Sequence, residues 1–179
     1  SIRSTRVSSP LISHMLSPQF FEELKAYSGF REEDTIILKQ IHEAVRARFP
    51  AVVDDFYARI LEQEATRRIL TGSGQAERLE QVERLKGTLR EWLDEVFLGP
   101  HDAAYFQKRV RIGEAHVRVG LRQPFVFGAM SHIRRLLDDE IERVTRGDAE
   151  KRRRALSALA KVLDIDLALI AGSYHEAEK

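Results

Sequence analysis

Apolar residues recur every three or four positions along nearly the whole chain, which is the spacing of one face of an α-helix. The clearest stretch runs from residue 75 to residue 98, where the apolar residues at helical intervals are Leu79, Val82, Leu85, Leu89, Leu93 and Val96. No Asn-Gly or Asp-Gly turn lies between alternating runs, and that turn is the strongest short signal of a β-hairpin. The pattern therefore predicts an all-α fold.

Capping residues and glycines divide this pattern into helices. Ser17-Pro18, Asp102 and Asp148 stand where the N-cap of a helix is expected, and Gly29 and Gly120 follow apolar runs as stops. The predicted helices cover residues 17–28, 31–48, 51–63, 65–70, 75–98, 102–119, 124–145 and 148 almost to 179, with a Gly/Ser loop at 71–74.

The size and charge of the chain narrow the classes of function. Its 179 residues, 43% of them hydrophobic, suit one domain, which we expect over residues 17–179 after a flexible arm at residues 1–16. The chain has 29 Lys and Arg against 28 Asp and Glu, so non-specific electrostatic binding to nucleic acid or to an anionic membrane is not favoured. No stretch approaches the about 18 apolar residues of a membrane span, and no signal peptide is present, so we expect a cytoplasmic protein. The absence of cysteine excludes thiolate ligands.

His116 stands apart from the other histidines because of its surroundings. It shares a helical face with Ile112 and Val119, and Gly113 and Gly120 flank it in the same predicted helix, where a glycine costs about 1 kcal/mol relative to alanine. Two explanations of the bare backbone stay open: a flat ligand pressed against the helix, or a close helix crossing. The remaining histidines are interpreted as surface or packing residues, with His14, His101 and His175 near loops or ends and His42 and His132 bordering the core.

Two polar residues lie on otherwise apolar helix faces. Tyr57 follows Phe56, and a buried phenol needs a partner for its hydroxyl group. Its donor either bonds a backbone carbonyl or points at a ligand in a pocket. Thr88 lies between Leu85 and Leu89, and its hydroxyl either lines the same pocket or bonds back into its own helix.

Three segments resemble the haem pocket of globin-coupled sensors, protoglobins and single-domain sensor globins. The proximal-histidine segment of that family is similar to Ile112-Gly113-Glu114-Ala115-His116-Val117-Arg118-Val119-Gly120-Leu121, followed here by Pro124-Phe125. Its distal segments are similar to Val53-Asp54-Asp55-Phe56-Tyr57 and to Arg84-Leu85-Lys86-Gly87-Thr88-Leu89. The resemblance covers about residues 31–179, and it implies a sensor-type globin fold with an extra N-terminal helix and long C-terminal helices.

The resemblance also implies a cofactor and its ligands. His116 would be the proximal ligand of haem b iron, and Tyr57 would donate a hydrogen bond to bound O₂, with Thr88 as an alternative or relay donor. The apolar residues that contribute to the pocket would be Phe56, Leu85, Leu89, Ile112, Val119 and Phe125. No catalytic residue is assigned.

The family resemblance favours a sensor module over an enzyme. We expect a haem-based O₂ sensor that also binds CO and NO. A haem enzyme of globin type, either a nitric-oxide dioxygenase or a peroxidase-like globin, is the alternative. A haem-free interaction domain is disfavoured, because such a core has no use for His116 beside two glycines.

The last two predicted helices carry apolar residues on more than one side. Their spacing suits a helix–helix seam, and the residues are Leu156, Leu159, Leu163 and Ile170 in the last helix and Ile133, Leu137 and Ile141 in the one before. A wide core face or a two-fold dimer explains them, and the resemblance implies the dimer. We predict a homodimer through these helices that passes the gas signal to an output domain of kinase, cyclase or chemotaxis type.

Overall fold

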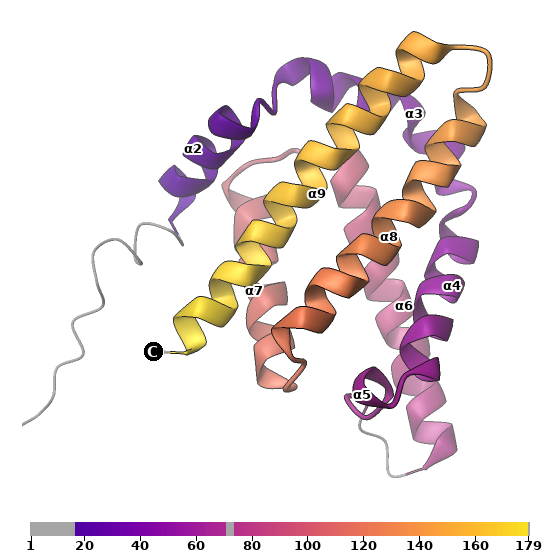
Figure 1. Ribbon diagram of the computed structural model, residues 1–179, viewed down its shortest axis with the longest axis vertical. Coiled ribbons are helices and arrows are strands. Elements are labelled where there is room, and N and C mark those ends of the chain that lie inside the picture. The colour runs from indigo at the N-terminus through magenta and orange to yellow at the C-terminus, as the bar shows by residue number, and fades with distance from the viewer. Residues whose placement is uncertain (1–16, 71–73, 179) are drawn as a thin grey trace, which may run out of the picture.

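The structure, a computed structural model, describes residues 17–70 and 74–178. Within these residues the chain forms helices and no strand, which confirms the all-α prediction (Figure 1). The helices are α2 (Pro18–Ser28), α3 (Glu32–Arg46), α4 (Phe49–Glu62), α5 (Glu64–Arg67), α6 (Gln75–Leu98), α7 (Ala103–Arg118), α8 (Gln123–Val144) and α9 (Ala149–Ala177). The arm predicted for residues 1–16, His14 and most of the predicted Gly/Ser loop lie outside the described residues.

The predicted caps begin the helices as expected. The side chains of Ser17, Asp102 and Asp148 each accept a hydrogen bond from a backbone N–H three residues later, at 3.0–3.1 Å. Gly29 ends α2 with a left-handed φ of 72°. The boundary between the second and third predicted helices is shifted, because α3 ends at Arg46 and Pro50 lies in the first turn of α4 rather than before it.

Helices α8 and α9 lie side by side and antiparallel, with α6 and α7 behind them (Figure 1). Helix α9 is the centre of the fold, since α3, α7 and α8 all pack on it, whereas α6 packs on α3 and α4. The core between these helices is apolar, and its fully buried members include Leu38, Val45, Leu93, Val96, Phe97, Leu137, Ile141, Leu159 and Leu163. No helix in the described part of the chain is both long and apolar enough to cross a membrane.

The residues assigned to a dimer seam are used inside the single chain. Leu159 and Leu163 have no exposed surface, and Ile170 is 6% exposed. Leu137 and Ile141 of α8 are likewise fully buried. The seam interpretation is therefore wrong for these residues, because a wide core face accounts for them. Dimerisation stays a prediction that they do not support.

Candidate functional site

His116 lies in the last turn of α7 and is half-buried. Its ring atom Nδ1 lies 2.7 Å from the backbone oxygen of Ile112, one turn earlier. A carbonyl oxygen only accepts hydrogen bonds, so Nδ1 is the donor in this contact, and in the neutral ring Nε2 then keeps its lone pair. A metal-binding imidazole is held in this way, because the bond at one nitrogen fixes the ring and the tautomer for the other.

The two glycines near His116 have explanations other than a flat ligand. A Cβ atom on Gly113 would lie 2.4 Å from Ser173 Oγ and 3.2 Å from Ile170 Cα, so the close crossing of α7 and α9 requires a bare backbone there. Gly120 is not in the helix, because α7 ends at Arg118 and Gly120 has a left-handed φ of 80°. The helix-crossing explanation therefore holds for Gly113, and a turn explains Gly120.

Tyr57 lies on α4 and is 8% exposed. Its hydroxyl group makes no hydrogen bond to another described residue, although a buried phenol normally has a partner. Burial raises the pKa of Tyr57 to about 12, so the phenol keeps its proton at neutral pH. Tyr57 is thus a protonated hydrogen-bond donor on a mostly buried side chain.

Some apolar side chains of α4, α6 and α7 are only half-buried. Phe56, Leu85, Leu89 and Ile112 pack against the main core but keep part of their surface exposed. Helices α6 and α7 meet where Glu95 pairs with Lys108, at 2.8 Å, yet they do not pack on each other along their lengths. The two helices therefore leave apolar surface that an apolar group can cover.

The structure places the other predicted pocket residues less favourably. Thr88 is exposed, and its Oγ1 donates to the backbone oxygen of Arg84 at 3.2 Å, which is the back-bond considered above. Val119 follows the last residue of α7 and is 55% exposed, and Phe125 is half-buried in the first turn of α8. No hydrogen bond or ring contact among residues 17–70 and 74–178 joins His116 to Tyr57.

The remaining histidines behave as packing or surface residues, with one correction. His101 is buried rather than solvated, because its Nε2 lies 3.0 Å from the carbonyl oxygen of Val96 and its ring packs on aromatic neighbours. His175 is exposed, as predicted. His42 is half-buried, with Nε2 2.8 Å from the carboxylate of Asp94.

The sequence of this chain matches the Protoglobin family model over residues 18–179. The chain belongs to the protoglobin family. Among solved structures it is similar to the globin domain of the Geobacter sulfurreducens globin-coupled sensor, with 32% identity, a TM-score of 0.77, and coverage of 86% of this chain and 96% of that one. It also shares its fold with the ferric globin domain of E. coli DosC, at 14% identity and a TM-score of 0.67, over 86% and 98% of the two chains. These matches confirm the predicted globin fold.

The donor set of this protoglobin fits the haem that its family implies. Haem iron needs one axial donor, and His116 presents Nε2 with its ring already held by Ile112. A hydrogen-bond donor in an apolar setting would suit a gas ligand bound to the iron, and Tyr57 is such a donor. Thiolate ligation is excluded because the chain contains no cysteine.

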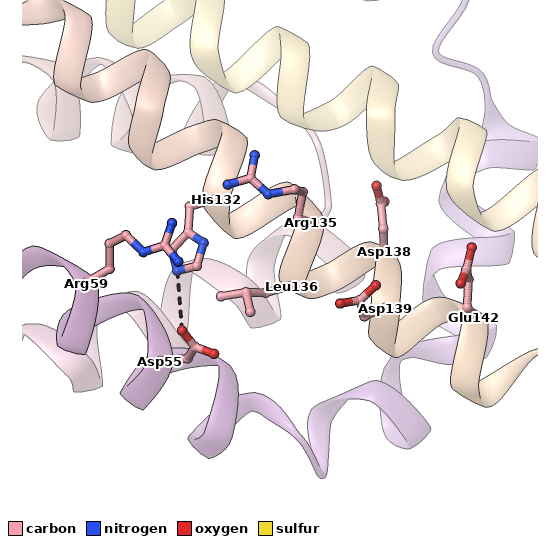
Figure 2. A pocket seen from close by; sticks show the side chains of 8 residues that line it. All are labelled: Asp55, Arg59, His132, Arg135, Leu136, Asp138, Asp139 and Glu142. Carbon is pink, nitrogen blue, oxygen red and sulfur yellow. Dashed lines mark ion pairs between the residues drawn. The ribbon is translucent and has the colours of Figure 1, made fainter.

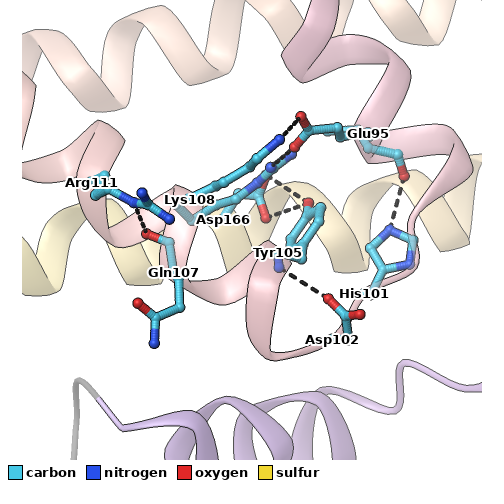
Figure 3. A network of polar contacts seen from close by, with 10 residues as sticks. Glu95, His101, Asp102, Tyr105, Gln107, Lys108, Arg111 and Asp166 are labelled. Carbon is cyan, nitrogen blue, oxygen red and sulfur yellow. Dashed lines mark hydrogen bonds and ion pairs between the residues drawn. The ribbon is translucent and has the colours of Figure 1, made fainter.

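Sequence reasoning missed a buried ionic cluster that ties α6, α7 and α9 together (Figure 3). Arg109 and Asp166 have no exposed surface, and Arg109 Nε donates to Asp166 Oδ2 at 3.2 Å. Tyr105 donates to both oxygens of Asp166, at 2.7 and 2.9 Å, and its ring lies under the Arg109 guanidinium. Arg109 Nη1 also donates to Glu95 of α6 at 2.5 Å. Asp166 interrupts the most apolar stretch of the sequence, and that was the available signal for a buried partner.

Proposed function

We propose that this protoglobin is a haem-based sensor domain for a diatomic gas, with O₂ as its ligand. The observation that carries the proposal is the state of the His116 ring, whose Nδ1–H is held by the Ile112 carbonyl while Nε2 is left as a donor. Haem b held by one neutral imidazole would bind O₂, CO or NO.

The residues of the proposed gas-binding pocket would have separate tasks. Tyr57 holds a proton at its hydroxyl oxygen and would donate it in a hydrogen bond to the gas ligand. Phe56, Leu85 and Leu89 would exclude water, and the low local dielectric strengthens the bond from Tyr57. Thr88 bonds to its own helix, so we assign the principal donor role to Tyr57.

Contacts from α7 to the end of α9 support a sensor role for the domain. The backbone oxygen of His116 accepts from Leu121 N at 3.2 Å, and the Leu121 carbonyl accepts from the Tyr174 hydroxyl of α9 at 2.6 Å. Helices α7 and α9 pack so closely at Gly113 and Ser173 that no larger side chain fits between them. A shift of the His116 helix would therefore move the end of α9, which is the differential contact that an allosteric output requires. We place the receiver in an output domain or a partner, with a second copy of this chain as the expected partner.

A haem titration tests the proposal. Wild type and His116→Ala are titrated with haem b, and the Soret absorption band reports binding. His175→Ala, which removes an exposed histidine near the end of α9, is the control. We expect one haem per wild-type and control chain, loss of most binding in His116→Ala, and partial recovery when free imidazole is added. Wild type without a Soret band, or His116→Ala with unchanged binding, would overturn the proposal.

A further inference from the structure

His101 lies in the connection between α6 and α7 and is 9% exposed (Figure 3). Its Nε2 atom lies 3.0 Å from the backbone oxygen of Val96, and Nε2 is the donor because a carbonyl oxygen only accepts. Its Nδ1 atom is buried without a hydrogen bond to any described residue. A Cβ atom on Gly99 would lie only 2.8 Å from Nδ1, so the ring packs against the backbone of the connection. A second proton on this ring would therefore find no acceptor.

The same histidine contacts the N-terminal helix α2 through its backbone and through its ring. Lys25 of α2 donates from Nζ to the backbone oxygen of His101 at 2.6 Å. Phe30, which follows α2, meets the His101 ring edge-on, with centroids 5.0 Å apart. The His101 ring also packs on Tyr105 of α7, with centroids 4.8 Å apart. His101 thus joins the end of α2 to the start of α7.

We propose that His101 forms an acid-sensitive contact, in which the neutral ring keeps α2 packed on the connection between α6 and α7 and protonation of the ring releases α2. The proposal stands on the contacts of His101 and goes beyond the proposed function. It does not depend on the ligand of His116.

The direction of the effect follows from the surroundings of the ring. Burial, together with the positive charges of Arg109, Lys25 and Lys39, lowers the pKa of His101 below its ordinary value of 6.5, against the opposite effect of the bond to Val96. A ring that leaves the connection regains the ordinary pKa, so the released form binds the proton more tightly. The packed form is therefore fully favoured above about pH 6.5 and becomes less favoured as the pH falls below that value.

One other group near the connection responds to acid. Asp166 of α9 accepts from Tyr105, and burial raises the pKa of its carboxyl group, so its protonation has to be separated from that of His101. The remaining charged groups of the neighbouring helices are engaged: Glu22 with Lys25, Asp102 with the Tyr105 backbone N–H, and Glu95 with Lys108 and Arg109.

Release of α2 would act on the helix that carries His116. Phe21 of α2 stacks on Tyr105 and Phe106 of α7, with centroids 6.1 and 5.6 Å apart. Tyr105 is also the residue that donates to Asp166 in the buried ionic cluster. Without α2, these two aromatic rings would lose the cover that Phe21 provides.

Backbone hydrogen exchange tests the proposal, because it detects a released helix even when the released form is rare. The full chain is exchanged between about pH 5 and pH 8, the range in which an imidazole titrates. Mass spectrometry follows peptides from α2 and α8, and protection is corrected for the exchange rate of free amides at each pH. In wild type we expect the protection of α2 to fall about three- to tenfold per pH unit below about pH 6.5, since tenfold is the limit for one proton. The protection of α8 should stay level.

Two variants remove the titrating ring. His101→Gln keeps a donor for the Val96 carbonyl, and His101→Phe keeps an aromatic ring beside Phe30 and Tyr105. In either variant the protection of α2 should no longer depend on pH. Asp166 is unchanged in both, so a loss of α2 protection in acid that equals the wild-type loss would assign the effect to another group and overturn the proposal.

His132→Gln is the matched control. His132 is also buried, at 7% exposed, and its Nε2 atom makes no hydrogen bond, but it lines a groove between α4 and α8 opposite Asp55 (Figure 2). This variant should lose α2 protection in acid as wild type does. A flat wild-type profile, or equal losses in α2 and α8, would overturn the proposal. Failure of the proposed function would show separately, as a wild-type chain without a Soret band.

Discussion

The junction of α6, α7 and α9 and the edge of α4 against α8 both bury polar side chains, but they satisfy them differently. At the junction, Arg109, Asp166 and Tyr105 bond to one another, and among the atoms of these three side chains the Arg109 Nη2 alone is buried without a hydrogen bond. At the α4 edge, His132 Nε2 is buried without a hydrogen bond to any described residue, and Tyr57 lies on the same helix edge with a side chain that is 8% exposed. Buried polar groups are normally paired, so the first arrangement holds helices together, whereas the second leaves a buried nitrogen without a partner.

The two regions are connected through α7. Arg109 lies two turns before His116, so the ionic cluster fixes the helix that carries the proposed axial ligand. The junction therefore holds α7, and with it His116 of the proposed site, in place. The α4 edge carries Tyr57, the hydrogen-bond donor that the proposed function assigns to the gas ligand.

The largest expected effect comes from breaking the ionic cluster. Arg109→Met leaves Asp166 buried without its cation, and removing one partner of a buried pair costs about 3–5 kcal/mol. Lys108→Met is the matched control, because Lys108 pairs with the same Glu95 from a side chain that is 58% exposed. Urea unfolding followed by circular dichroism measures both. Equal losses in the two variants would show that the junction does not depend on its buried pair.

The next effect concerns the close crossing beside His116. Gly113→Ala places a Cβ against Ser173 and Ile170, and overpacking of this kind costs about 1–3 kcal/mol. Gly128→Ala on α8 meets nothing within 4 Å and should instead stabilise the helix by about 0.5–1 kcal/mol. Thermal unfolding of both variants gives the comparison. If Gly113→Ala unfolds at the same temperature as wild type, α7 and α9 can move apart without cost. That result would remove the proposed route for a signal to the end of α9.

A smaller effect follows from the raised pKa of Tyr57. The folded chain keeps the phenol proton up to about pH 12, whereas the unfolded chain releases it near 10.0, so this stabilisation is present at neutral pH and is lost as the pH rises through the folded value. Between about pH 9 and pH 11, wild type should lose about 1 kcal/mol more stability than Tyr57→Phe. Tyr27→Phe, at a ring that is 93% exposed, should behave as wild type. Parallel curves for wild type and Tyr57→Phe would show that the phenol is not buried.

Much of the fold follows from local sequence signals. The caps at Ser17, Asp102 and Asp148 and the 3.6-residue period of the apolar positions were enough to predict the helices and their order. The family resemblance supplied the globin topology, which periodicity alone does not determine. The roles of His116 and Tyr57 stay predictions, to which the structure adds the contact of His116 Nδ1 with Ile112 and the burial of Tyr57.

The errors have a common physical cause, because each depends on packing between distant segments. The apolar stripe of Leu159 and Leu163 looks the same in sequence whether a core or a second chain covers it. Gly113 is required by Ser173, which lies 60 positions later. The partner of Arg109 likewise comes from a helix remote in sequence. Helical spacing shows which residues share a face but not what that face meets.

The O₂ dissociation rate of Tyr57→Phe tests the central claim most directly, since that claim is that the Tyr57 phenol donates a hydrogen bond to the gas ligand. The substitution removes one hydroxyl group and keeps the ring that contacts Phe56. A hydrogen bond of this kind is worth about 1–1.5 kcal/mol, so the account predicts dissociation roughly tenfold faster than in wild type, measured by stopped-flow on the ferrous protein. Equal rates in a variant that retains its Soret band would contradict it.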